Sequence, residues 1–117
     1  MIDAYGDGRF RISGQIHTGS ILLAPDRVLP WGTTTLTAFS PQQIFDQISP
    51  LLMPAGKRPE ILLLGCGARI EMIPPALRVL FKDRGVSLEP MDTGAACRTY
   101  NVLAGEDRLV AAALIAV

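Results

Sequence analysis

The sequence predicts a small α/β protein, and three observations lead to this fold class. Short apolar runs alternate with amphipathic stretches in the C-terminal half, which is the pattern of a strand–helix–strand–helix–strand run. A strand–turn–strand pattern comes earlier in the chain. The 117 residues, 49% hydrophobic and 19% charged, suit one domain with its own core. We therefore expect residues 1–117 to form a single compact domain, with disorder left open only for residues 1–8.

The first elements expected are strands. Residues 9–31 are strand-like, and Pro25-Asp26 is a turn signal because proline presets φ for the turn and aspartate bonds to nearby backbone. The sequence thus predicts an N-terminal β-hairpin with strands over residues 20–24 and 28–31.

A helix is predicted to follow. Ser40 is placed as its N-cap, Pro41 as its first residue and Gln43 as the partner that completes a capping box. Pro50 removes a backbone donor and clashes with the preceding turn, so the regular helix should end or kink just before it. The rest, up to Pro59, is expected to be a connection.

The second half carries the parallel elements. Residues 60–64 form an apolar run without alternation, which is typical of a strand buried on both faces, and Gly65-Cys66-Gly67 ends it. A helix should start near Pro74, with Gly85 as its left-handed C-cap. Residues 86–91 are predicted as the next strand.

The last helix and strand follow from similar signals. Asp92 is expected to cap a helix that Gly105 ends. The final strand should run from Arg108 to Val117. Its apolar character and many alanines predict a position in the middle of the sheet, with helices packed closely on it.

Composition excludes several classes of protein. Eleven basic and eleven acidic residues cancel, which argues against a nucleic-acid partner. The apolar runs are too short for an integral membrane protein, and the N-terminus lacks the features of a signal peptide, so we expect a cytoplasmic protein. Two distant cysteines and a single histidine give no metal-site spacing, so no metal or cofactor is predicted.

One candidate ligand site lies where the parallel strands should end. Open α/β sheets bind ligands beyond the carboxyl ends of their strands, and the backbone N–H groups of a glycine-rich exit can form an anion-binding nest. Ile70 stands where a dinucleotide fingerprint needs its third glycine, so a small anion or metabolite is favoured over a dinucleotide. The candidate ligand-binding residues are Gly65, Cys66, Gly67, Asp92, Thr93 and Arg98.

Other residues are candidates for contacts with a partner protein. Arg98 and Asn101 share the less apolar side of the last helix, where they could also make only local hydrogen bonds. Trp31 could anchor a partner, although closing the core is the favoured interpretation. Cys97 is interpreted as a buried core residue and His17 as a structural one. No catalytic set emerges, so we favour a non-catalytic protein and keep an enzyme as the alternative.

Three segments resemble a known family: HTGSILLAPDRVLPW (residues 17–31), EILLLGCG (60–67) and MDTGAACRTYNVLAGEDRLVAAALIAV (91–117). Together these segments span nearly the whole chain, and they are similar to the Mth938-like domain proteins. Relatives in this family include the mitochondrial respiratory complex I assembly factor 3 and an adipogenesis-associated Mth938 domain protein.

The resemblance implies a three-layer α/β fold with a mixed central sheet and no established enzymatic activity. It also implies a protein-interaction or assembly factor that acts through protein partners. The alternative is a small-molecule or anion-binding protein, or a minor enzyme, that uses the crevice at the strand ends.

Overall fold

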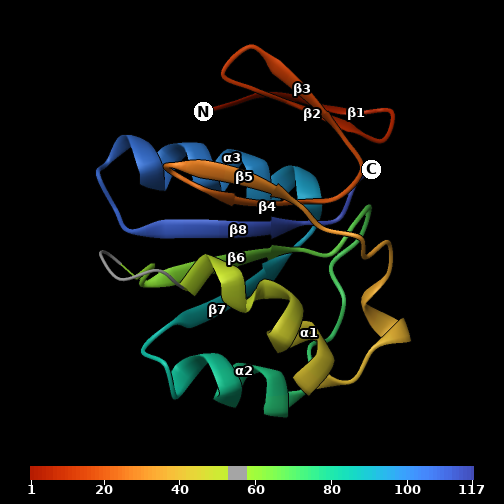
Figure 1. The fold of residues 1–117 in the computed structure, drawn as a ribbon, viewed down its shortest axis with the longest axis vertical. Helices are drawn as coiled ribbons and strands as arrows, with labels where there is room; N and C mark the ends of the chain where they lie inside the picture. The colour runs from red at the N-terminus through yellow and green to blue at the C-terminus, as the bar shows by residue number, and fades with distance from the viewer. Residues whose placement is uncertain (53–57) are drawn as a thin grey trace.

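A five-stranded mixed sheet forms the centre of the protein (Figure 1), in a computed structural model that describes residues 1–52 and 58–117. Its strand order is β5-β4-β8-β6-β7; β6 is parallel to β7 and β8, and β4 is antiparallel to β5 and β8. The strands are β4 (Ile21–Ala24), β5 (Arg27–Pro30), β6 (Ile61–Gly65), β7 (Ser87–Met91) and β8 (Val110–Leu114). The helices are α1 (Pro41–Ile48), α2 (Pro75–Lys82) and α3 (Thr93–Gly105), with short 3-10 turns at Leu36–Ala38 and Ser49–Leu52.

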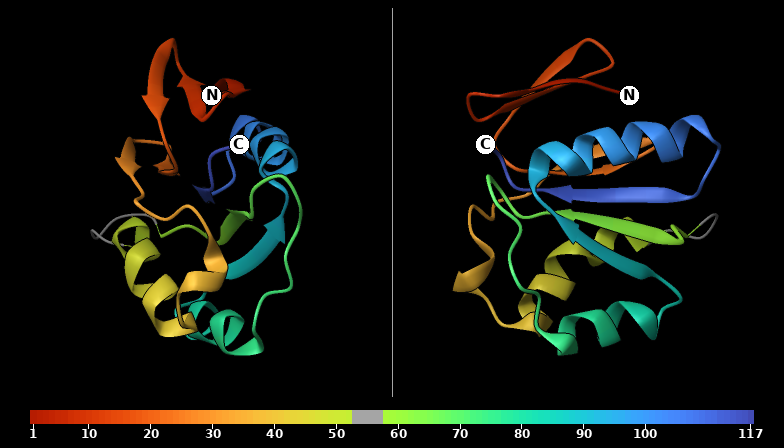
Figure 2. Two further views of the ribbon diagram at one scale, coloured as in Figure 1. Left: turned by 90° about the vertical axis from the view of Figure 1, so that its right-hand side faces the viewer. Right: turned by 180° about the vertical axis from the view of Figure 1, so that it is seen from behind.

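Both faces of this sheet are buried, which makes the fold three-layered as expected (Figure 2). Successive side chains of a strand point to opposite faces. Leu62 and Leu64 accordingly belong to the core that the sheet shares with α1 and α2, whereas Leu63 belongs to the core shared with α3. Between α1 and α2 the rings of Phe45 and Phe81 meet edge to face, with 4.9 Å between centroids.

A second, three-stranded antiparallel sheet lies on the α3 side of the molecule. It consists of β1 (Ile2–Gly6), β2 (Arg9–Ile12) and β3 (Gln15–Thr18). Phe10 and Ile12 of this sheet pack into the core beside α3. Residues 1–8, for which the sequence left disorder open, therefore include a paired strand.

The predicted hairpin and first helix are confirmed. β4 and β5 pair across the turn at residues 25–26. Ser40 Oγ accepts the amide of Gln43, and Gln43 Oε1 accepts the amide of Ser40, which is the complete capping box with Pro41 at the first position. α1 ends two residues before Pro50. The predicted connection up to Pro59 includes residues 53–57, which lie outside the described residues.

The C-terminal run is confirmed, with β8 in the third of five positions, but β8 is shorter than predicted. At its start, Arg108 still donates its amide to Leu103 and so completes the end of α3. At its end, the Ala116 amide bonds to Ser20 Oγ and the Val117 carbonyl accepts the Gly8 amide. The residues on either side of β8 thus bond to other elements instead of extending the strand.

Candidate functional site

The predicted ligand residues at the strand ends do come together. Thr93, the first residue of α3, lies against the exit of β6 and has no exposed surface. Its hydroxyl accepts the Gly67 amide at 2.9 Å and donates to the Ile115 carbonyl at 2.8 Å. The Thr93 amide donates to the Gly67 carbonyl at 2.8 Å. One threonine therefore joins β6, α3 and the end of β8.

The same contacts occupy the backbone amides that an anion would need. The amides of Cys66 and Gly67, which would form the predicted anion nest, donate to Met91 O and Thr93 Oγ1. A Cβ on Gly65 would lie 3.0 Å from Leu114 Cδ2 and 3.0 Å from Thr93 Oγ1, so the glycine permits close packing of the strands on α3. The arrangement is that of a packed junction.

The other two ligand candidates, Asp92 and Arg98, make hydrogen bonds within α3 and to β1. Asp92 Oδ1 accepts the Ala95 amide at 2.8 Å, which makes Asp92 the N-cap as predicted. Arg98 is exposed and donates through Nη1 to the hydroxyl of Tyr5 at 3.2 Å. Arg98 points to β1 rather than to the Gly65–Gly67 turn.

The partner candidate Asn101 holds the N-terminal sheet onto α3. Its side-chain Oδ1 accepts the Ile2 amide and its Nδ2 donates to the Ile2 carbonyl, both at 2.8 Å. The amide thus pairs with β1 as a neighbouring strand would. Arg98 and Asn101 line one cavity of about 340 Å³ together with residues 2–5 and Cys97. The polar side of α3 is therefore largely occupied by β1.

The third partner candidate, Trp31, is a core residue. It is 4% exposed, and its indole Nε1 donates to Gln47 Oε1 at 2.8 Å. The same oxygen accepts the Thr33 hydroxyl. Trp31 closes the core between the hairpin and α1, which was the favoured interpretation.

Sequence reasoning missed the residues that meet α3 from the N-terminal sheet. Asp7 and Gly8 between β1 and β2, and Ser13 and Gly14 between β2 and β3, all have positive φ. Two-residue loops of this kind form the type I′ turns of β-hairpins, and Asp-Gly is among their strongest sequence signals. That dipeptide could have placed Tyr5 in a strand.

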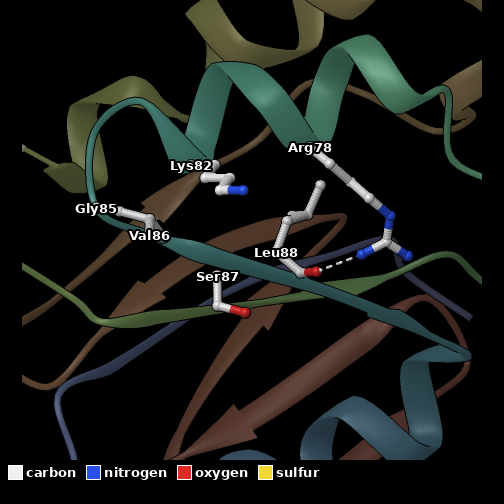
Figure 3. Close-up of a pocket in the computed structure, with 6 residues that line it drawn as sticks. All are labelled: Arg78, Lys82, Gly85, Val86, Ser87 and Leu88. Atoms are coloured by element: carbon white, nitrogen blue, oxygen red, sulfur yellow. Dashed lines mark hydrogen bonds between the residues drawn. The ribbon is translucent and has the colours of Figure 1, made fainter.

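A groove of about 400 Å³ lies between α2 and the outer side of β7 (Figure 3). Arg78 and Lys82 extend from α2 over it, and Arg78 Nη1 donates to the Leu88 carbonyl at 2.9 Å. Of the two cations in the groove, Arg78 is therefore already hydrogen-bonded to β7.

A larger cavity, of about 560 Å³, lies between β3, the β4–β5 turn and α3. His17, Asp26 and Tyr100 are among the residues that line it. Tyr100 is 3% exposed, and within the described part of the chain its hydroxyl makes no hydrogen bond. Burial, with a smaller contribution from the charge of Asp26, raises the pKa of Tyr100 to about 12.

Both cysteines are buried free thiols. Burial raises the pKa of Cys97 to about 11, more than the neighbouring Arg98 charge lowers it. Burial also raises the pKa of the Cys66 thiol. Neither has the depressed pKa of a reactive cysteine.

The connection between β6 and α2 exposes apolar side chains. Ile70 is 62% exposed and Met72 is 99% exposed. The neighbouring Ile73 instead packs on the core of α1 and α2, which ties the segment to the sheet. We call residues 68–72 the apolar loop.

Two other features are absent from the described part of the chain. Within residues 1–52 and 58–117, no three His, Cys, Asp or Glu side chains are grouped as a metal site would need. In the same ranges, no helix has the length and apolar character to cross a membrane.

Comparison with known proteins relates the chain to several relatives. An uncharacterized protein of Rhodobacter capsulatus is 40% identical over 97% of this chain and 82% of its own length. The NADH dehydrogenase [ubiquinone] 1 alpha subcomplex assembly factor 3 of Xenopus tropicalis is 33% identical over 98% of this chain. This chain spans about 60% of that relative.

A solved structure supports the same relationship. The solution structure of a Bordetella pertussis protein described as a Mth938-like domain superimposes with a TM-score of 0.80 at 30% identity. The alignment covers 98% of this chain and 84% of the other. The family model described as a protein of unknown function (DUF498/DUF598) matches residues 2–115. The chain therefore belongs to the DUF498/DUF598 family, whose members include Mth938-like domains.

Proposed function

We propose that this protein is a non-catalytic protein-interaction factor, of the assembly-factor kind named for its animal relatives. The observation that carries the proposal is the apolar loop, where Ile70 and Met72 expose most of their side-chain surface. Methionine is enriched in protein–protein interfaces because its flexible, polarizable side chain fits varied surfaces. We place the proposed docking surface on this loop. We also propose that the protein is cytoplasmic, and its two free thiols support a reducing compartment.

The loop lies next to the junction that the sequence identified as a ligand site. The packed contacts of Thr93 with Gly67 hold the first residues of the connection in place. A rigid base of this kind lowers the entropic cost of binding through the exposed residues that follow.

The test is affinity capture from the native cell with the full chain, comparing two double variants. Ile70→Ser/Met72→Ser removes the exposed apolar groups of the loop. Val79→Ser/Val102→Ser is the matched control, because these valines are also exposed but lie on α2 and α3. We expect the loop variant to lose a partner that wild type and control both retain. Equal capture by both variants, or no specific partner for wild type, would refute the proposal.

A second candidate function, small-molecule binding, is favoured by Tyr100. Tyr100 lines the cavity of about 560 Å³, and its hydroxyl makes no hydrogen bond within the described part of the chain, so it is available to bond to a molecule held there. We therefore propose the 560 Å³ cavity, rather than the strand ends, as the candidate ligand site. A thermal-shift panel of organic acids, amines and nucleotides tests it, since a ligand at 100 times its Kd stabilises by about 2.7 kcal/mol. A shift that Tyr100→Phe leaves unchanged would argue against this cavity.

A further inference from the structure

Each of the two sheets has an edge strand on either side. The four edge strands differ in how many backbone N–H and C=O groups they leave unpaired. An edge strand presents unpaired N–H and C=O groups to which an extended segment of another protein can add. The edges are β5 and β7 in the large sheet and β1 and β3 in the small one. The register shows which residues of each strand face outward.

The outward side of β7 has few groups left to pair. The Ser87 amide donates to Glu60 O and the Met91 carbonyl accepts from Cys66, so these residues face β6. In a parallel ladder alternate residues face opposite sides, which turns Leu88 and Pro90 outward. Pro90 has no N–H, and the Leu88 carbonyl is bonded to Arg78 (Figure 3).

The outward sides of β5 and β1 are each closed at one position. The Trp31 amide donates to Ser20 O, so alternation along the antiparallel ladder turns Val28 and Pro30 outward on β5. Pro30, like Pro90, offers no donor. On β1, the side chain of Asn101 already bonds both the N–H and the C=O of Ile2.

The outward side of β3 is open. The Gly19 amide donates to Gly8 O, and in this register Gln15 and His17 exchange backbone bonds with β2. The backbone N–H and C=O groups of Ile16 and Thr18 therefore point away from β2. Within the described part of the chain, nothing bonds these groups. The Ile16 side chain is 60% exposed.

Positive charge lies beside this edge. Arg11 is opposite Ile16 and Arg9 is opposite Thr18 on β2, and side chains opposite each other share one face of a sheet. Both arginines are exposed, and among the described residues neither takes part in an ion pair. A second copy of this chain would bring further arginines to the same face, whereas an acidic segment would complement it.

We propose that β3 adds an extended, acidic segment of a partner protein as a fourth strand of the small sheet. The outward N–H and C=O groups of Ile16 and Thr18 form the new ladder, and acidic side chains of the segment lie beside Arg9 and Arg11. This inference rests on the proposed function and adds a second contact with the partner, at β3, to the one proposed at the apolar loop.

The experiment follows backbone amides by NMR during titration with a capped heptapeptide, Thr-Glu-Val-Glu-Val-Glu-Thr. We expect slowed hydrogen exchange at Ile16 and Thr18, and at least tenfold weaker binding of the same peptide with lysine in place of glutamate. Ile16→Pro removes an outward N–H and leaves the bonds to β2 intact, so it should lose at least tenfold in affinity. Val28→Pro, the same change at an outward position of β5, is the control and should bind as wild type does.

Arg9→Glu/Arg11→Glu should reverse the preference between the two peptides. Absence of protection at Ile16 and Thr18, or equal binding by Ile16→Pro and wild type, would overturn the proposal. So would a dimer in solution that Ile16→Pro dissociates, because the occupant would then be a second copy. If cellular capture still depends on the apolar loop while the peptide fails to bind, strand addition is wrong and the proposed function stands.

Discussion

At the scale of single residues, function and packing compete for the same side chains. Asn101 is a polar helix residue of the kind that could recognise a partner, yet both ends of its amide bond to the Ile2 backbone. Trp31 is an aromatic at the end of a hairpin, yet only 4% of it is exposed. Residue type therefore identified polar and aromatic positions that matter, but their partners lie 99 and 16 residues away in the chain.

Gly65 provides a direct test of the packed junction at the strand ends. Gly65→Ala should lower the free energy of unfolding by about 1–3 kcal/mol, because the new methyl group would be forced against Leu114 and the backbone of Thr93. Gly32→Ala is the control, since a Cβ at Gly32 meets no atom within 4 Å. Urea denaturation measures both. Equal stability of the two variants would mean that the junction accommodates an added methyl group and is not tightly packed.

At the scale of elements, local signals predicted the strands and helices well. The capping box of Ser40 and Gln43, the Asp92 N-cap and the positive φ of Gly85 all depend on residues within a few positions of one another. The strand-like stretch predicted over residues 9–31 includes β2 and β3. β1 and the separate small sheet were missed because these strands are short and mostly exposed, so they lack a long apolar run. The start of β8 was missed because the Arg108 amide still bonds to Leu103 at the end of α3. Its end was missed because Ser20 and Gly8, which are distant in the chain, bond to the residues after it.

The closed edge of β7 predicts what happens when it is opened. Pro90→Ala restores an outward N–H, and Arg78→Ala frees the Leu88 carbonyl. We expect the double variant to self-associate as concentration rises, because edge strands with free donors and acceptors pair with one another. Light scattering and sedimentation velocity measure this association.

The matched control for that experiment is Pro25→Ala/Lys82→Ala. It also removes one proline and one cation, but Pro25 lies in a turn and Lys82 only lines the groove. The control should remain in the same state as wild type. If both double variants associate equally, loss of charge rather than the opened edge is responsible.

At the scale of the whole molecule, the buried sheet determines what the sequence could and could not say about function. Leu63 and Leu64 of β6 point to opposite faces of the large sheet and belong to different cores. Because both faces must then be covered by other elements, the continuous apolar run of β6 predicts a three-layer arrangement. The candidate site does not follow in the same way. Gly65, Cys66 and Thr93 were placed together correctly by topology, but whether a cavity or a contact forms there depends on side-chain packing across three elements.

Burial of ionisable groups in the α3 core should make the whole protein sensitive to alkaline pH. The pKa of Cys97 is raised to about 11 and that of Tyr100 to about 12, mainly by burial. In the unfolded chain they would lose their protons near the ordinary values of 9.0 and 10.0. Ionisation then favours the unfolded state, so stability is fully present below about pH 9 and falls as pH rises through the folded-state values.

Urea denaturation between pH 7 and pH 11 should therefore show a flat region followed by a decline that approaches about 1.4 kcal/mol per pH unit for each group. Cys97→Ala/Tyr100→Phe should decline less steeply, even if the loss of packing makes it less stable at every pH. Cys66→Ala separates the smaller contribution of the other buried thiol, whose pKa is also raised. An unchanged slope in the double variant would show that α3 opens before the core ionises, because a group exposed by local opening titrates as it does in the unfolded chain.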